Sequence, residues 1–117
     1  TPYTDDVQSK ILANYAAAGF DCIAERHLGI SENFAFSEID DETILQMCRD
    51  VAQHKPQAIS IICTNMRGAH LAEQLEAELG IPIYDSISVV VLRALELAGI
   101  APSRIKGWGK IFQTAGE

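Results

Sequence analysis

Short apolar runs alternate with amphipathic stretches along most of the chain, and this alternation restricts the possible folds more than any other feature. The segments AISII at 58–62 and IPIYDS at 81–86 have the length and composition of buried strands. Between them lies a stretch with helical spacing, whose apolar residues are Leu71, Ala72, Leu75 and Leu79. A strand, a helix and a second strand in this order indicate a right-handed crossover and a parallel sheet with helices on both faces.

Three other stretches have helical spacing. The first begins near Thr4 or Asp5, either of which can cap a helix, and stops at Gly19. The second is capped by Asp40 or Asp41, and its apolar stripe comprises Ile44, Leu45, Cys48, Val51 and Ala52. The third is the largely apolar SISVVVLRALELAG, which Gly99 closes and which could bury itself against a partner such as a second copy of this chain.

Further strands are predicted from the remaining segments. FDCIAERHLGI predicts a short strand that leads into a loop, and TPYTDD reads as the continuation of a strand that precedes Thr1. SENFAFSEID is turn-like, with Phe34 and Phe36 as anchors, and the tail APSRIKGWGKIFQTAGE predicts loop with one short strand. We therefore expect one α/β domain over residues 1–117, with a parallel sheet of about four strands in a flavodoxin-like three-layer sandwich.

Charge and cysteine content exclude several classes of function. The 117 residues carry 16 acidic and 9 basic side chains, a net charge of −7, which argues against binding to nucleic acid or an anionic membrane. No apolar run approaches the roughly 20 residues of a membrane span. Three widely separated cysteines without a C-x-x-C pair indicate reduced thiols in a cytoplasmic protein, with no structural zinc.

Polar residues follow the strands at the edge where ligands of parallel sheets usually bind. Cys63, Thr64 and Asn65 come directly after the run AISII, and Ser86 follows the next strand. A cysteine before a helix start is favoured as thiolate, the nucleophilic form. Cys63 could instead be a small core residue, but the two polar residues behind it are hard to explain by packing, so we favour a functional thiol.

For each of the other candidate side chains, a structural role is at least as well supported by the sequence as a functional one. Tyr3 is either an aromatic cover for the rim of the core or a phenol that donates to an anionic substrate. Cys22 and Cys48 are expected in the core. The three histidines, His27, His54 and His70, are expected to have structural roles, and His70 should point away from Cys63.

Several separated segments together resemble a known family. They are TPYTDDV, NYAAAGFD, RHLGISEN, ICTNMRG, IPIYDS and KGWGKIF. They are similar to the maleate isomerase and arylmalonate decarboxylase branch of the Asp/Glu racemase superfamily, and the similarity covers about the second half of a family member. The resemblance implies a pseudo-symmetric enzyme of two α/β lobes with the active site between them, without metal or organic cofactor.

The resemblance also implies roles for particular residues. Cys63 matches the second-half cysteine, the acid/base partner of a nucleophilic cysteine on the other lobe, and Tyr3 matches a substrate hydrogen-bond donor. Thr64 and Asn65 match residues that hold a substrate carboxylate, and Ser86, at a rim position, is expected to contact the substrate as well. These 117 residues would then be the C-terminal lobe of a longer enzyme, inactive without its partner lobe.

Three hypotheses follow for the function. The leading one is the catalytic lobe of a cofactor-independent isomerase, racemase or decarboxylase of small carboxylates or dicarboxylates, with maleate-like isomerisation favoured. The second is a non-catalytic α/β binding or regulatory module. The third is a thiol hydrolase with Cys63 as nucleophile, which requires a histidine within hydrogen-bond reach of the sulfur.

Overall fold

The computed structural model describes residues 1–114. The helices are α1 (Asp5–Ala17), α2 (Asn33–Phe36), α3 (Asp41–Ala52), α4 (Ala72–Leu79), α5 (Ser86–Leu97) and α6 (Ile111–Thr114), with 3-10 turns η1 (Ala69–Leu71) and η2 (Pro102–Arg104). The strands are β1 (Ile59–Ile61) and β2 (Ile83–Asp85). This order confirms an α/β chain in which a helical crossover joins two strands.

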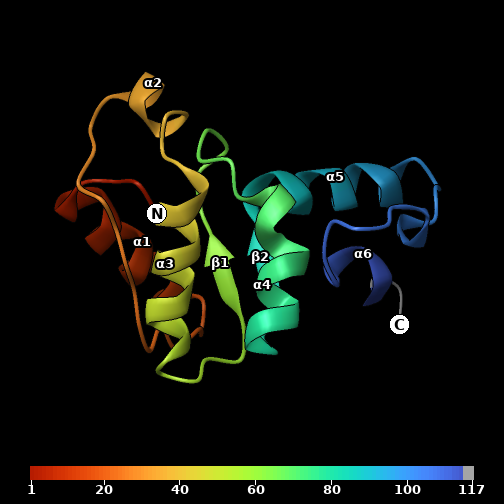
Figure 1. The fold of residues 1–117 in the computed structure, drawn as a ribbon, viewed down its shortest axis with the longest axis horizontal. Coiled ribbons are helices and arrows are strands. Elements are labelled where there is room, and N and C mark those ends of the chain that lie inside the picture. Colours follow the sequence, from red (N-terminus) through yellow and green to blue (C-terminus); the bar gives the residue numbers. More distant parts are fainter. Residues whose placement is uncertain (115–117) are drawn as a thin grey trace.

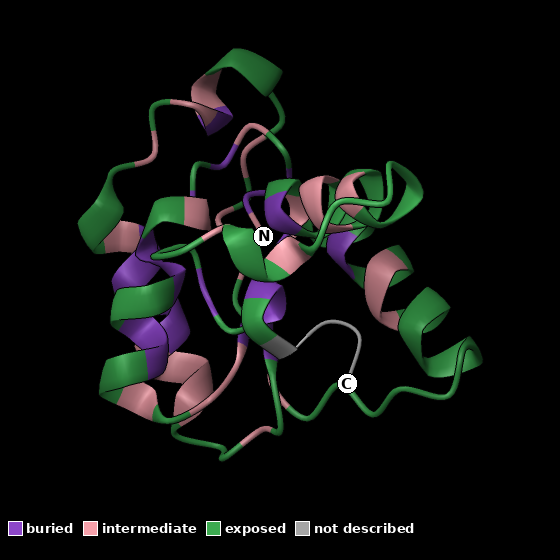
Figure 2. Ribbon diagram, turned by 90° about the vertical axis from the view of Figure 1, so that its right-hand side faces the viewer, coloured by how far each residue is buried: buried purple, intermediate pink, exposed green. Residues whose placement is uncertain are grey.

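The two strands are parallel neighbours, and Ile59, Ser60 and Ile61 pair in register with Ile83, Tyr84 and Asp85. Helices α3 and α4 lie on one face of this sheet, and α1 and α5 lie on the other (Figure 1). Buried residues face the interior between these layers, and the outer surfaces of the helices are exposed (Figure 2). The carboxyl ends of β1 and β2 therefore meet at one edge, as the crossover rule requires.

The start of α3 follows the predicted capping signal, whereas the start of α1 does not. The Asp40 carboxylate accepts a 2.8 Å hydrogen bond from the N–H of Thr43 and so caps α3. Gly80 ends α4 in the left-handed conformation, at φ 68°, which glycine adopts without a steric penalty. Thr4 stands at the N-cap of α1, where its side chain makes no capping hydrogen bond.

The core lies between the sheet and helices α3 and α4. Its most completely buried side chains include Leu75, Ile83 and Ile44, at 0, 0 and 1% exposure. The predicted stripe of α3 is confirmed at Ile44, Leu45 and Cys48, and the pattern missed Met47, which is also buried. Burying these side chains supplies the main stabilisation of the fold, at roughly 1.5–3 kcal/mol for each large aliphatic group.

Several sequence predictions are wrong within residues 1–114. The sheet has two strands instead of four, because residues 20–28 form a loop with no hydrogen-bonded neighbouring strand and the tail forms η2 and α6. Cys22, which lies in this loop, is exposed instead of buried in the core. Phe34 is 71% exposed and anchors nothing, whereas Phe36 is buried as predicted.

Helix α5 carries exposed apolar side chains along its length. They include Ile87, Val89, Val90 and Leu97.

Across residues 1–114, no helix combines the length and the apolar character that crossing a bilayer would require.

Candidate active site

Cys63 lies two residues beyond the end of β1, in a backbone conformation that only a few residues adopt. Its φ is 145°, in a region that non-glycine residues avoid for steric reasons. The residue is 7% exposed, so the thiol is largely covered. Such strain costs of the order of 1–3 kcal/mol and persists only where the surroundings hold the residue in place.

Ser86, the first residue of α5, holds the backbone of Cys63. The N–H of Cys63 donates to Ser86 Oγ at 3.1 Å, and this hydroxyl donates to the carbonyl of Ile61, also at 3.1 Å. One hydroxyl thus joins the start of α5 to both sides of the turn that carries the thiol. In this structure the Ser86 hydroxyl hydrogen-bonds to backbone groups, which indicates that it positions the turn at Cys63.

Tyr3 provides a phenol next to this thiol. Burial and a hydrogen bond with the Cys63 side chain raise the pKa of Tyr3 to about 12. Its ring contacts Phe36 edge to face, with the centroids 5.5 Å apart. The phenol therefore remains protonated at neutral pH and can donate a hydrogen bond to the sulfur or to an oxygen bound beside it.

Asp85, the last residue of β2, is a buried carboxylate for which the sequence predicted no particular role. Its Oδ2 accepts from the N–H of Ile87 at 2.8 Å and of Ser88 at 3.4 Å, so it caps α5 and fixes the helix start that carries Ser86. Its other oxygen, Oδ1, has no hydrogen-bond partner among the described residues. Burial raises the pKa of Asp85. An aspartate directly before an apolar helix is a signal that could have identified this cap.

Gly68 allows the turn after Cys63 to pack closely against the sheet. A Cβ at this position would lie 2.9 Å from Ile61 Cδ1 and 3.1 Å from Asp85 Oδ1, closer than carbon atoms normally approach. Any larger residue would therefore push the turn away from β1 and β2. The sequence does not predict this requirement, because a glycine in a turn usually indicates a special backbone conformation, whereas Gly68 is needed for lack of space.

The polar residues after Cys63 lie on the surface of the turn. Thr64 is exposed, and Asn65 Nδ2 donates to the side chain of Asn33 at 3.2 Å and to its carbonyl at 3.4 Å. Arg67 Nη2 donates to the carbonyl of Ser37 at 3.0 Å. The turn is thereby fastened to the segment around α2, which also supplies Phe36 beside Tyr3.

One prediction about the thiol environment is wrong. The sequence pattern predicts a helix directly after Cys63, but η1 begins at Ala69 and α4 at Ala72. The intervening turn is used for the contacts to Asn33 and Ser37, so the start of α4 does not lie at the thiol. The helix that begins beside Cys63 is α5, through Ser86.

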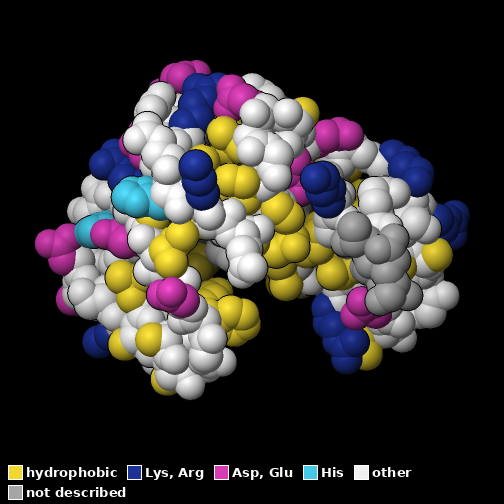
Figure 3. Space-filling view, turned by 90° about the horizontal axis from the view of Figure 1, so that it is seen from below, with side chains coloured by type: hydrophobic (Ala, Val, Ile, Leu, Met, Phe, Trp, Pro, Cys, Tyr) yellow, Lys and Arg dark blue, Asp and Glu magenta, His cyan; other side chains and the backbone are white. Residues whose placement is uncertain are grey.

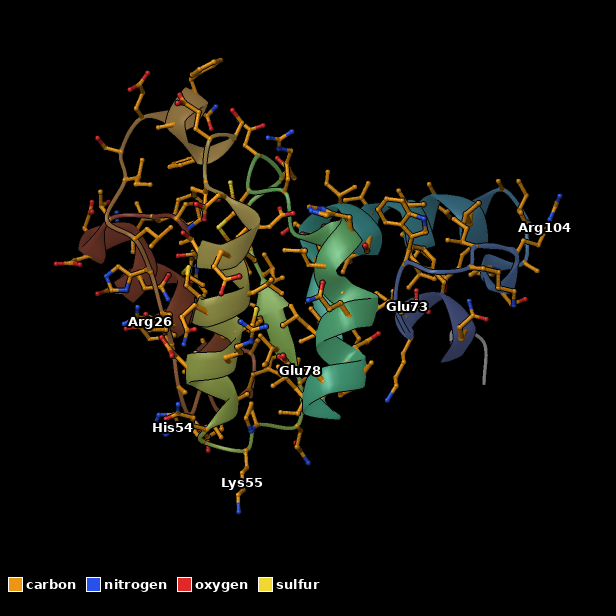
Figure 4. All side chains as sticks on the ribbon, in the orientation of Figure 1. Arg26, His54, Lys55, Glu73, Glu78 and Arg104 are labelled. Atoms are coloured by element: carbon orange, nitrogen blue, oxygen red, sulfur yellow. The ribbon has the colours of Figure 1, made fainter. Side chains whose placement is uncertain are left out.

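The histidines lie elsewhere. His27 makes hydrogen bonds to Asp5 at 2.6 Å and Glu25 at 2.7 Å, which raise its pKa, and His70 bonds to Asp41 at 2.9 Å. His54 lies beyond the end of α3 and points away from the body of the molecule (Figure 4).

Among residues 1–114 no histidine hydrogen-bonds to Cys63, which argues against the thiol hydrolase. Nor do three or more His, Cys, Asp or Glu residues of this range form a group that could hold a metal ion.

These contacts define an α/β lobe with a covered thiol and a protonated phenol at the carboxyl edge of its parallel sheet. The profile of a family described as arylmalonate decarboxylase matches residues 1–112. The chain belongs to the arylmalonate decarboxylase family, which confirms the resemblance predicted from the sequence.

Two curated relatives match nearly all of this chain. The arylmalonate decarboxylase of Bordetella bronchiseptica is 26% identical over an alignment of 114 positions that covers 96% of this chain and 48% of that protein. The maleate isomerase of Nocardia farcinica is 27% identical over an alignment of 117 positions that covers 97% of this chain and 45% of that protein. The chain thus spans about half the length of the curated relatives that it matches.

Solved structures share the fold. A variant of the Nocardia farcinica maleate cis-trans isomerase with a covalently bound succinylcysteine intermediate superposes with a TM-score of 0.89 at 23% identity, covering 98% of this chain and 47% of that one. A liganded arylmalonate decarboxylase variant superposes with a TM-score of 0.86 at 24% identity, covering 97% and 49%. The described residues therefore have the fold of about half of each of these enzymes.

Proposed function

We propose that this chain is one catalytic lobe, the C-terminal one, of a cofactor-independent isomerase or decarboxylase of small carboxylates, with the cis-trans isomerisation of a maleate-like dicarboxylate as its reaction. The observation that carries the proposal is the pairing of the Cys63 thiol with the Tyr3 phenol at the sheet edge. The family match and the maleate isomerase among the relatives support the substrate class.

Cys63 acts in this proposal as an acid and a base. A thiolate of the partner lobe adds to one alkene carbon and forms a C–S bond, and the Cys63 thiol delivers its proton to the neighbouring carbon. The former double bond is then a single bond and can rotate. Cys63 takes a proton back from that carbon, the C–S bond breaks, and the double bond forms again in the trans arrangement. Nothing is oxidised or reduced, so the cycle balances without a cofactor.

The surrounding groups stabilise the charge that develops in this cycle. Addition to the alkene places negative charge on the adjacent carboxylate, and hydrogen-bond donors aimed at such charge are worth several kcal/mol in a covered site. Tyr3 supplies an O–H that stays protonated at neutral pH, since its pKa is about 12. Thr64 and Asn65 hold a substrate carboxylate in this proposal, with Ser86 fixing the turn from which they project.

The test is Cys63→Ala in the full-length protein, assayed on maleate and on arylmalonates. We expect loss of activity on the true substrate, with Cys22→Ala as the matched control because Cys22 is an exposed cysteine. Full activity of Cys63→Ala on every substrate that the wild-type protein converts would reject the catalytic role. A wild-type protein that binds these carboxylates without converting them would instead support the non-catalytic binding module.

A further inference from the structure

Among residues 1–114, two carboxylates are buried, those of Glu76 and Asp85. Both oxygens of Glu76 accept hydrogen bonds, from the N–H of Ile83 at 3.1 Å and from the N–H of Lys110 at 2.8 Å. Asp85 is 1% exposed, yet its Oδ1 accepts none from the described residues. The acidic side chains visible from below, by contrast, stand on the surface of the molecule (Figure 3). A buried carboxylate oxygen without a donor costs stability, so the position of Asp85 calls for an explanation.

The bonded oxygen of Asp85 is linked to the turn at Cys63 through the start of α5. Oδ2 accepts from the N–H of Ile87 at 2.8 Å and of Ser88 at 3.4 Å, which fixes the first turn of this helix. Ser86 belongs to the same helical turn, and its hydroxyl accepts from the N–H of Cys63 at 3.1 Å. A displacement of the helix start therefore displaces the hydroxyl that holds the backbone of Cys63.

The unbonded oxygen of Asp85 lies against the other end of that turn. Oδ1 would be 3.1 Å from a Cβ at Gly68, so the glycine backbone packs closely against it. The N–H of Gly68 favours the charged carboxylate weakly, without completing a hydrogen bond to Oδ1. Asp85 thus contacts the turn of residues 63–68 at its end and holds its beginning through Ser86. Cys63, at φ 145°, keeps its strained conformation only while such contacts fix it.

Positively charged groups face Asp85 from the turn and from η1. Arg67 and His70 line, together with Asp85, a cavity of about 210 Å³. A positive charge on His70 favours the carboxylate form of Asp85, and the imidazole bonds to Asp41 of α3 at 2.9 Å. Arg67 donates to the carbonyl of Ser37 at 3.0 Å. Both side chains therefore bond to other groups, and neither donates to Asp85 Oδ1.

The elements β1, α4 and α5 also pack against β2. β1 presents Ile61, which pairs in register with Asp85, and the first turn of α5 carries no charged side chain. α4 supplies the carboxylate of Glu76, which accepts from the N–H of Ile83, two residues before Asp85. Burial is the largest influence on Asp85, and it raises the pKa of this carboxyl. Asp85 therefore takes up a proton at a higher pH than an ordinary aspartate.

We propose that Asp85 is a positioning residue for Cys63, which couples the uptake of a proton to a movement of the turn that carries the thiol. The proton binds Oδ1, because Oδ2 already accepts from two N–H groups. A neutral carboxyl accepts from the N–H groups of α5 more weakly than a carboxylate does, so the helix start loosens. The new O–H also needs room against Gly68, which displaces the end of the turn. The proposal deepens the proposed function, on which its consequence for catalysis rests, and the coupling itself is measurable without any substrate.

The test is a pH titration of the 117-residue chain by two-dimensional ¹H–¹⁵N NMR, between about pH 4 and about pH 7. The amide of Ile87 reports the carboxylate directly, and the amide of Cys63 reports the turn. We expect both signals to shift with one common midpoint, above the ordinary aspartate value of about 3.9. Asp85→Asn keeps an acceptor for the helix and places a donor beside Gly68. In this variant neither amide should titrate, and the Cys63 signal should lie close to its low-pH position in the wild type.

The matched control is Asp40→Asn, which neutralises the carboxylate that caps α3 and should leave the titration of Cys63 unchanged. Ser86→Ala tests the route from Asp85 to the turn, because it removes the hydroxyl that accepts from Cys63. The Ile87 amide should then keep its titration while the Cys63 amide loses most of its own, and Ser86→Thr, which keeps a hydroxyl, should restore it.

Three results would overturn the proposal. They are a Cys63 amide that does not move with that of Ile87 in the wild type, one that titrates alike in Asp85→Asn, and one that titrates fully in Ser86→Ala. If Asp85→Asn failed to fold, the wild type and the Ser86 variants would still decide. Full activity of Cys63→Ala would reject the proposed function without altering these shifts, so the two failures are distinguishable.

Discussion

Replacing Ser86 by alanine tests whether the Ser86 hydroxyl holds the strained turn at Cys63. The substitution removes two 3.1 Å hydrogen bonds, from the N–H of Cys63 and to the carbonyl of Ile61. At about 1 kcal/mol of net stability each, the loss is about 2 kcal/mol. Alanine recovers about 0.5 kcal/mol through its higher helix propensity at the start of α5. We therefore expect Ser86→Ala to lower the free energy of unfolding by about 1.5 kcal/mol.

Urea denaturation of the 117-residue chain, followed by circular dichroism, measures this difference. The matched control is Ser60→Ala, because Ser60 is an exposed serine on β1 whose substitution should change stability by less than about 0.5 kcal/mol. If Ser86→Ala and Ser60→Ala had the same midpoint, the hydroxyl bridge would not contribute, and the account of how Cys63 is held would be refuted.

Three further predictions follow from the same structure. Gly68→Ala should lower the free energy of unfolding by about 1–3 kcal/mol in urea denaturation, because its Cβ would press on β1 and on Asp85; an unchanged midpoint would contradict this packing. Iodoacetamide should label exposed Cys22 first and buried Cys48 last, since burial raises the pKa of Cys48 to about 11; peptide mass spectrometry gives the order, and early labelling of Cys48 would contradict it. The two carboxylates beside His27 raise its pKa, so their stabilisation is present below the unfolded pKa of about 6.5 and is lost as pH rises through the folded value. His27→Gln should therefore cost more stability at pH 5.5 than at pH 8.5 in paired urea titrations, and an equal loss at both would refute the assignment.

The helices and the sheet edge that carries the candidate site could be predicted from the sequence because their signals are local. Asp40 before an amphipathic stripe predicts the start of α3, and an apolar run that stops at Cys63 predicts the end of a buried strand. The class of fold and the place of the thiol both followed from these patterns. The sequence predicts both Cys63 and Tyr3 as site residues although they lie 60 residues apart in the chain, and the structure brings the two side chains into contact.

The remaining features depend on contacts between distant residues. Residues 20–28 have the composition of a strand, but strand formation also requires a neighbour on the sheet, and the structure has an open groove at that position. The contact between Gly68 and Asp85 depends on how closely a turn approaches β2, which no local pattern encodes. The long turn after Cys63 was missed because its polar residues bond to the segment around α2, 30 to 32 residues earlier in the chain.

The most direct test of the central claim is a double-mutant cycle on the thiol and the phenol in the full-length protein. The rate of maleate conversion, as kcat/KM, is measured for the wild type, Cys63→Ser, Tyr3→Phe and the double variant. Cys63→Ser should lose about 10²- to 10⁴-fold, the usual contribution of general acid–base catalysis. If the two side chains act as one unit, the double variant should be little worse than Cys63→Ser alone. Wild-type kcat/KM in Cys63→Ser, or strictly multiplicative losses in the double variant, would contradict a paired thiol and phenol.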